Sequence, residues 1–189
     1  MLKPEEKEKL YKEIKALTDF SSEDAANLAS ISDVMKAHSE PLTDYFYGHL
    51  DRVESTKTII DGEDGRRGRL KATLMKWFEN LFEGNYDMNY ANDILRIGSV
   101  HVVKKIDQRY VLAMYGMVFQ YITSIMEKEF PGDTEKIEKL SLSVGKILSI
   151  DMALMMETYI SGLVDSTGWS MALLKNMAAQ SMETKMNQQ

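Results

Sequence analysis

Proline is the residue whose placement most constrains the fold of this chain. It occurs only at positions 4, 41 and 131, so the segment from 42 to 130 contains no helix-breaking proline. Each proline can stand in the first turn of a helix, where its missing N–H is not needed. Valine and isoleucine recur at spacings of three and four, not at the spacing of two that is typical of strands. The sequence therefore predicts an all-α fold.

Helix boundaries are predicted from the apolar periodicity and from capping residues. Ser21, with Asp24 three residues later, is a typical helix start, and Asp107 is another. Residues 55–60 are too short to assign, and residues 61–68 (DGEDGRRG), with three glycines, form the clearest loop. The expected helices cover about 4–17, 21–38, 41–53, 69–83, 88–105, 107–130 and 133 to beyond 160.

The last of these helices predicts a dimer. It meets no breaker before Gly162 or Gly168, and about 30 residues span roughly 45–50 Å. Its apolar residues occupy more than one face, which favours a homodimer formed through the last two long helices; the alternative is the central core helix of a monomer. Asp151 looks buried among the apolar residues of this helix; the alternative is an exposed turn or a polar contact of the dimer. After Gly168, helical spacing continues at Trp169, Leu173 and Met177, but the polar end at 181–189 is expected to fray.

Composition excludes several classes of function. The absence of cysteine rules out disulfide frameworks, thiolate zinc sites and cysteine nucleophiles. Acidic residues outnumber basic ones, 29 to 23, which argues against nucleic acid as the main partner. No apolar stretch approaches the ~20 residues of a membrane helix, and residues 1–15 do not resemble a signal peptide. We expect a cytoplasmic protein without membrane insertion. No nucleophile–base pair or phosphate loop indicates an enzyme.

Three histidines, His38, His49 and His101, remain as versatile ligands. His101 lies among apolar residues on its helix, so it is either a hydrogen-bonded core histidine or a metal ligand. One histidine cannot hold zinc, which needs three or four protein ligands. It can serve as the single axial ligand of a heme, whose porphyrin supplies four nitrogens. His38 and His49 are expected to be solvated or capping residues.

Several segments, taken in order and at their intervals, resemble the sensory globin domain of the globin-coupled sensors. The resemblance covers about residues 20–165 and implies a globin fold with an extra N-terminal helix. It divides the chain into an N-terminal extension (1–20), a globin domain (21–165) and a connector (166–189) toward an output module. Its landmarks are Phe46-Tyr47, Ile59-Ile60, RLKATLMKWFENLF at 69–82, RIGSVH at 96–101, RYVLAMY at 109–115 and the long last helix.

The resemblance also implies a heme b site. His101 would bind the iron through Nε2, with its Nδ1–H donated to a backbone carbonyl or another acceptor. Tyr47 would be the distal hydrogen-bond donor to a bound gas, Thr73 a second distal hydroxyl, and Leu70 an apolar residue that closes the pocket. Gly98 would let its helix approach the ring. The full set of expected cofactor contacts is Phe46, Tyr47, Ile59, Ile60, Leu70, Thr73, Ile97 and Tyr110.

The implied function is sensing of O2, with CO and NO as further candidate ligands. Ligand binding would repack the helices of a homodimer and signal to an output module that this chain does not contain. One departure from the family pattern is Val111, which stands where relatives often carry a tyrosine able to bond the proximal imidazole. Two alternatives stay open at this point: a heme-free dimeric signalling or interaction module with a globin fold, and a helical scaffold.

Overall fold

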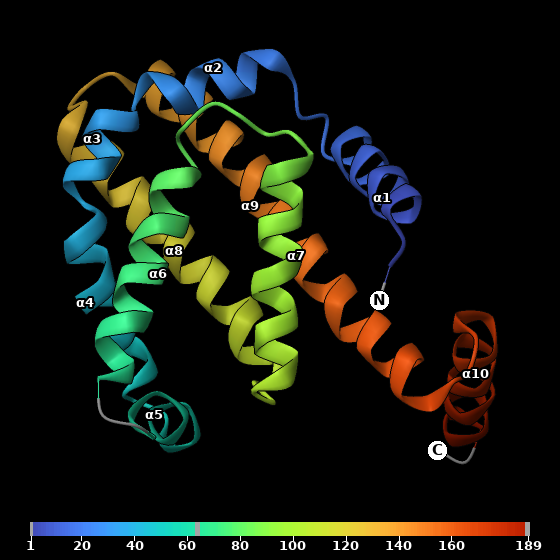
Figure 1. The fold of residues 1–189 in the computed structure, drawn as a ribbon. Helices are drawn as coiled ribbons and strands as arrows, with labels where there is room; N and C mark the ends of the chain where they lie inside the picture. Colours follow the sequence, from blue (N-terminus) through green and yellow to red (C-terminus); the bar gives the residue numbers. More distant parts are fainter. Residues whose placement is uncertain (1, 63–64, 188–189) are drawn as a thin grey trace.

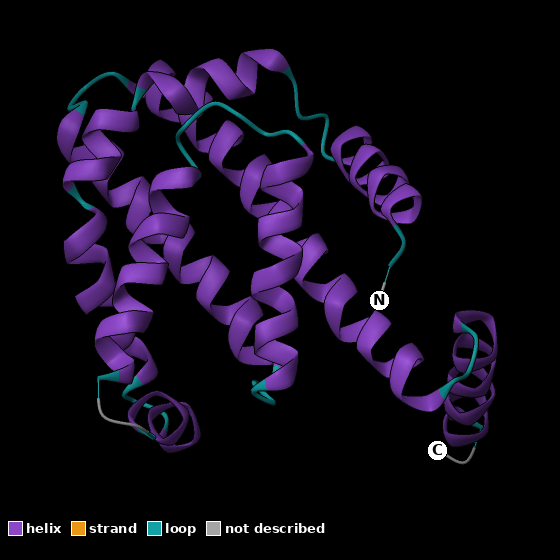
Figure 2. Cartoon of the chain, viewed as in Figure 1, coloured by secondary structure: helices purple, strands orange, loops and turns teal. Residues whose placement is uncertain are grey.

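The chain is helical wherever the structure describes it. The structure is a computed structural model that describes residues 2–62 and 65–187, and every regular element in these ranges is an α-helix (Figures 1 and 2). The predicted all-α class is confirmed. The helices are α1 (Pro4–Leu17), α2 (Ser22–Ser30), α3 (Ser32–Ala37), α4 (Ser39–Leu50), α5 (Glu54–Asp61), α6 (Arg66–Asn80), α7 (Met88–Val103), α8 (Gln108–Glu129), α9 (Thr134–Thr167) and α10 (Met171–Met186).

Short polar side chains begin several of these helices. At the start of α2, the Ser21 hydroxyl accepts a hydrogen bond from the Asp24 N–H, and the Asp24 carboxylate accepts one from the Ser21 N–H. This reciprocal pair satisfies two amide donors that the first turn leaves free. Asp87, Asp107 and Asp133 cap α7, α8 and α9 in the same general way.

Two predicted boundaries are wrong. The helix expected over 21–38 is two helices, because Ile31 leaves helical geometry (φ −112°, ψ 11°) while its side chain stays in the core. Helix α10 begins at Met171 after Gly168 ends α9 in the left-handed conformation, and it continues to Met186, so residues 181–186 are helical where fraying was expected. Ser170 caps α10 by accepting a hydrogen bond from the Leu173 N–H. The unassigned segment at 55–60 belongs to α5, and residues 63 and 64 of the predicted loop lie outside the described residues.

The N-terminal helix packs on the body of the helical domain. Tyr11 and Ile14 of α1 are buried, and α1 contacts α7 and α9. The Tyr11 hydroxyl donates to the Tyr86 carbonyl oxygen at 2.9 Å, which ties α1 to the loop before α7. The extra helix is therefore a part of the domain surface and not a free arm.

Helix α9 is the central element of the fold. It contacts α1, α2, α7 and α8, and its buried residues include Leu140, Val144, Ile147, Ile150 and Leu154. By length and composition it is the one helix of residues 2–62 and 65–187 that could span a membrane, whereas no apolar stretch of that length was expected from the sequence. Because α9 contacts four other helices, its apolar composition is also explained by its position in the core of the domain.

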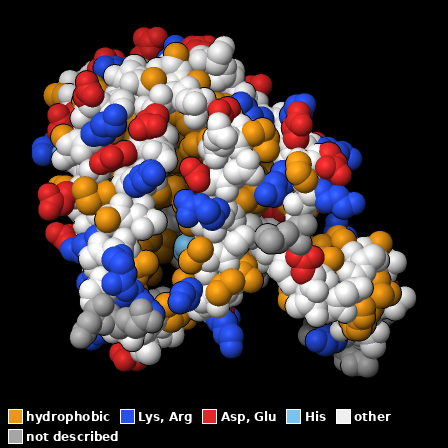
Figure 3. Space-filling model, in the orientation of Figure 1, with side chains coloured by type: hydrophobic (Ala, Val, Ile, Leu, Met, Phe, Trp, Pro, Cys, Tyr) orange, Lys and Arg blue, Asp and Glu red, His pale blue; other side chains and the backbone are white. Residues whose placement is uncertain are grey.

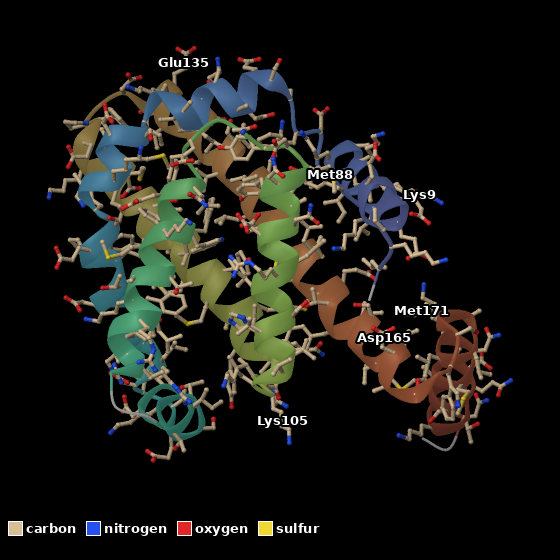
Figure 4. All side chains as sticks on the ribbon, viewed as in Figure 1. Lys9, Met88, Lys105, Glu135, Asp165 and Met171 are labelled. Atoms are coloured by element: carbon tan, nitrogen blue, oxygen red, sulfur yellow. The ribbon has the colours of Figure 1, made fainter. Side chains whose placement is uncertain are left out.

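Helices α6 and α7 stand on either side of a space in front of α8 (Figure 1). They are joined at one end by residues 81–87, and α7 runs from Met88 at that loop toward Lys105 near the opposite end (Figure 4). Helix α4 packs against α6 and α8, and α5 packs against α6. The space-filling view shows a hollow between α6 and α7, with hydrophobic side chains and a histidine on its wall (Figure 3).

Candidate functional site

His101 lies near the C-terminal end of α7, partly buried. Its Nδ1–H donates to the carbonyl oxygen of Ile97 one turn earlier, at 2.9 Å. A carbonyl can only accept, so this bond places the proton on Nδ1 and leaves Nε2 as a lone-pair acceptor. Nε2 has no hydrogen-bond partner in residues 2–62 and 65–187. Burial lowers the pKa of His101, against the raising effect of the Ile97 bond, so the ring is neutral near pH 7. A neutral imidazole with a free Nε2 is the form that binds a metal.

Tyr47 also carries a polar atom without a hydrogen-bond partner. It lies on α4 with 6% of its surface exposed, and its ring packs edge-on against Phe46 at a centroid distance of 5.4 Å. The hydroxyl has no hydrogen-bond partner among the described residues, and its oxygen is not completely shielded from solvent. Burial raises the pKa of Tyr47 to about 12, although Arg67 acts in the opposite direction. The O–H therefore stays protonated and is available as a donor.

An arginine clamp that the sequence did not reveal lies over Tyr47. The Arg67 guanidinium donates to both oxygens of Asp51, at 3.0 and 2.8 Å, and to Asp61 at 3.1 and 2.7 Å. Its central carbon is 5.8 Å from the centroid of the Tyr47 ring. The clamp joins the ends of α4 and α5 to the first turn of α6. In the sequence, Arg67 is one charge in a glycine-rich loop, and nothing local indicates its partners.

The other predicted cofactor contacts lie on the helices around the hollow. Ile60 is buried on α5, and Ile59, Leu70 and Ile97 are half-buried on α5, α6 and α7. The Tyr110 hydroxyl shares a 2.8 Å hydrogen bond with Ser55, which joins α8 to the start of α5. Their roles toward a cofactor stay predictions.

Thr73 and Gly98 differ from the expectation in their surroundings. The Thr73 side chain is exposed, and its hydroxyl donates to the Arg69 carbonyl in its own helix at 3.0 Å. Gly98 faces α9: a Cβ added there would lie 2.5 Å from Thr158 Oγ1 and 3.1 Å from Met155 Sδ. The glycine therefore allows α7 and α9 to approach each other closely.

The two other histidines are engaged elsewhere. His49 Nδ1 bonds the Tyr45 carbonyl oxygen at 2.8 Å, and His38 Nε2 lies 3.3 Å from the Glu129 carboxylate. No group of three or more metal-binding side chains occurs in the described ranges. A metal at this site would thus need a cofactor that brings its own ligands.

Asp151 is buried, as its apolar neighbours in the sequence indicate. It is neither on an exposed turn nor at the molecular surface, but has 0% of its surface exposed. The Trp77 indole N–H donates to its Oδ2 at 2.9 Å, and the Tyr90 hydroxyl donates to its Oδ1 at 2.7 Å. Its partners are 74 and 61 residues away in the sequence, so no local pattern could have found them.

Comparisons with known proteins identify a family and a related fold for this chain. The sequence model of one family, Protoglobin, matches residues 7–164. The heme-based aerotactic transducer HemAT of Halobacterium salinarum is 24% identical over 153 residues, which cover 77% of this chain and 31% of HemAT. The chain therefore spans about a third of that relative's length. The globin domain of a Geobacter sulfurreducens globin-coupled sensor superposes with a TM-score of 0.73 at 34% identity, covering 78% of this chain and 96% of that domain.

Proposed function

The chain belongs to the protoglobin family, and on that basis we propose that it is a sensor globin domain that holds heme b and binds O2. CO and NO are further candidate ligands. One observation carries the proposal. Two polar atoms, Nε2 of the partly buried His101 on α7 and the hydroxyl oxygen of the buried Tyr47 on α4, which packs against α6, have no hydrogen-bond partner among the described residues.

The residues present fit a heme. His101 presents a free Nε2 whose tautomer is fixed by Ile97, as an axial ligand requires. Half-buried and buried aliphatic side chains on α5, α6 and α7 offer an apolar surface beside it. The chain has no cysteine, so no thioether bond can attach the porphyrin, and heme b is the matching type. When bound, the heme iron supplies a coordination position at which a diatomic gas binds.

Tyr47 would select among gases. Its O–H remains protonated at neutral pH and is held in a largely buried place. O2 carries more negative charge on its outer atom than CO does when either is bound, so a fixed O–H donor favours O2. Arg67 holds the end of α4 against α5 and α6, and so limits the movement of the segment that carries Tyr47. Thr73 can contribute a second hydroxyl only if it leaves the Arg69 carbonyl.

We propose that the domain signals as a homodimer through α8 and α9. Large apolar side chains remain exposed on these helices: Leu112, Leu142, Ile160 and Leu163. Gas binding would shift the population of α7 positions and thereby the packing of α9, which contacts α7 closely at Gly98. Residues 166–189, with α10, would be the connector to an output module, and residues 1–20 an extension of the globin domain at 21–165. The relative HemAT is a transducer, which supports a binding and signalling role over catalysis.

An absorption spectrum tests the proposal. The purified protein, supplemented with hemin, should show a strong Soret band that shifts on reduction and again on addition of CO. His101→Ala should abolish stoichiometric heme uptake, because it removes the proposed iron ligand on α7. His49→Ala is the matched control and should bind heme as the wild type does, since its ring lies on α4 against the ring of Tyr45 at a centroid distance of 4.4 Å.

A protein that takes up no hemin would contradict the proposal and favour a heme-free signalling module. Normal heme uptake by His101→Ala would contradict the assignment of the ligand while leaving the cofactor in place.

A further inference from the structure

Asp151 is the one carboxylate at the centre of the fold, and its surroundings are unusual. It is fully buried on α9, accepts one hydrogen bond on each oxygen, from Trp77 and Tyr90, and no Lys, Arg or His of the described residues lies within 4.0 Å of it. A buried carboxylate without a cation is unfavourable unless its oxygens are satisfied or it takes up a proton. Asp151 can do either.

Its two donors come from the two walls of the hollow. Trp77 on α6 lies seven residues after Leu70, which is close to two helical turns. Tyr90 on α7 lies eleven residues before His101, which is close to three turns. Each donor thus projects from the same helix face as the predicted site residue on its wall. The Asp151 carboxylate on α9 therefore accepts a hydrogen bond from α6 on one oxygen and from α7 on the other.

The two bonds respond differently to a proton. A tryptophan N–H can only donate, whereas a tyrosine hydroxyl can donate or accept. The ionised carboxylate accepts from both. The protonated acid keeps its carbonyl oxygen for Trp77, and its new O–H can donate only to the Tyr90 oxygen, so the Tyr90 bond reverses and the tyrosine proton loses its acceptor. The change falls on α7, the helix that carries His101.

We propose that Asp151 is a proton-linked joint: its ionised form holds α6 and α7 on α9 through two charge-assisted hydrogen bonds, and its protonated form reverses and weakens the bond to α7. The joint itself follows from the packing. Its influence on gas binding rests on the proposed function above.

The groups that face Asp151 support exchange of this proton near neutral pH. They are the indole of Trp77 on α6 and four phenols: Tyr11 on α1, Tyr86 before α7, Tyr90 on α7 and Tyr115 on α8, whose ring meets that of Trp77 at 5.8 Å. All four phenols have raised pKa values and stay neutral. Burial raises the pKa of Asp151 to about 7, although the bonds from Tyr90 and Trp77 lower it.

The indole N–H of Trp77 reports the joint directly. The chain has two tryptophans, so a 15N–1H NMR spectrum gives two indole peaks, assigned with Trp169→Phe. In the purified protein we expect the Trp77 peak to shift through one midpoint between pH 5.5 and 8.5, while the peak of Trp169, which lies outside the core after α9, shows no such midpoint. A Trp77 peak that does not move with pH would overturn the joint.

Two variants distinguish the effect of protonating Asp151 from the effect of changing its packing. Asp151→Asn keeps the shape, because the amide oxygen can accept from Trp77 and the amide N–H can donate to Tyr90; its Trp77 peak should be present but independent of pH. Tyr90→Phe removes a bond that lowers the pKa of Asp151, so the midpoint should move to higher pH. A titration retained in Asp151→Asn, or a midpoint that is unchanged or lower in Tyr90→Phe, would contradict the proposal.

The coupling of Asp151 to the gas site is tested with the same indole N–H peak of Trp77. For the reduced, heme-loaded protein with and without CO, we expect midpoints that differ by at least ~0.3 pH units, which by linkage equals a twofold change in CO affinity between acid and alkaline pH. The CO titration can be followed by absorbance. Equal midpoints would overturn the coupling of the joint to the gas site. Absence of heme uptake would instead refute the proposed function, and the Trp77 titration would still decide the joint.

Discussion

Replacing Asp151 with asparagine should change how the stability of the protein depends on pH. In the unfolded chain an aspartate ionises near 3.8, whereas burial raises the pKa of Asp151 to about 7 in the folded protein. Between these values the folded state holds a proton that the unfolded state has lost. The free energy of unfolding contributed by Asp151 is therefore fully present below pH 3.8 and is lost as the pH rises through about 7.

The magnitude follows from the shift. About three pK units, at 1.4 kcal/mol each, give at most ~4 kcal/mol lost between pH 4 and pH 8. Asparagine cannot ionise, so Asp151→Asn escapes this loss. The difference in the free energy of unfolding, variant minus wild type, should rise by up to ~4 kcal/mol over that range. Urea unfolding followed by circular dichroism at pH 4.5, 6, 7 and 8 measures it, and other titrating groups cancel in the difference.

Asp24 is the matched control with the opposite sign. Burial alone would raise its pKa, but hydrogen bonds from the Ser21 backbone, Lys146 and Ser143 outweigh burial and lower the pKa to about 2. Its stabilisation is present above pH 3.8 and lost as the pH falls toward 2, so the deficit of Asp24→Asn relative to the wild type should stay nearly constant from pH 4.5 to 8 and shrink only below pH 3.8. Parallel stability curves for Asp151→Asn and the wild type would refute the reasoning about Asp151.

The remaining predictions concern packing and the arginine clamp. Gly98→Ala should lower the free energy of unfolding by ~1–3 kcal/mol, because the new Cβ would overlap the Thr158 side chain; Gly116→Ala, with open space around it, should be neutral or stabilising by up to ~1 kcal/mol. Equal effects in urea unfolding would count against close α7–α9 packing. Arg67→Gln should change global stability by less than ~1 kcal/mol, since its ion pairs are partly exposed, but should speed amide hydrogen exchange in α5. Unchanged exchange there would mean that the clamp does not hold α5.

Much of the fold could be predicted from the sequence because helix signals are local. The run without proline, the three-and-four spacing and the Asp caps gave the all-α class and most helix ends. Ile31 shows the limit, since its backbone turns out of the helix while its side chain satisfies the core, and nothing in its neighbours signals that choice. Helix α10 was underestimated because polar composition says little about a helix that begins with a good cap.

The residues of the site likewise divide into those that local sequence signals indicate and those that only tertiary packing brings together. His101 and Tyr47 could be selected by residue type and by family pattern, and the Nδ1 bond to Ile97 is an intrahelical contact that the expectation included. The partners of Asp151 and Arg67 come from other helices, and only tertiary packing brings them together. The neighbours of Gly98 were misjudged for the same reason, because the sequence does not say which helix crosses at that face.

The rate of O2 dissociation tests the central claim most directly, namely that Tyr47 and His101 serve one gas site. It can be measured by stopped-flow mixing of the oxygenated protein with CO. Tyr47→Phe should keep the heme and raise the dissociation rate about tenfold, the equivalent of one hydrogen bond of ~1.4 kcal/mol. Tyr45→Phe, whose ring instead packs on Tyr121 and His49, should leave the rate unchanged. An unchanged rate in Tyr47→Phe would contradict the account.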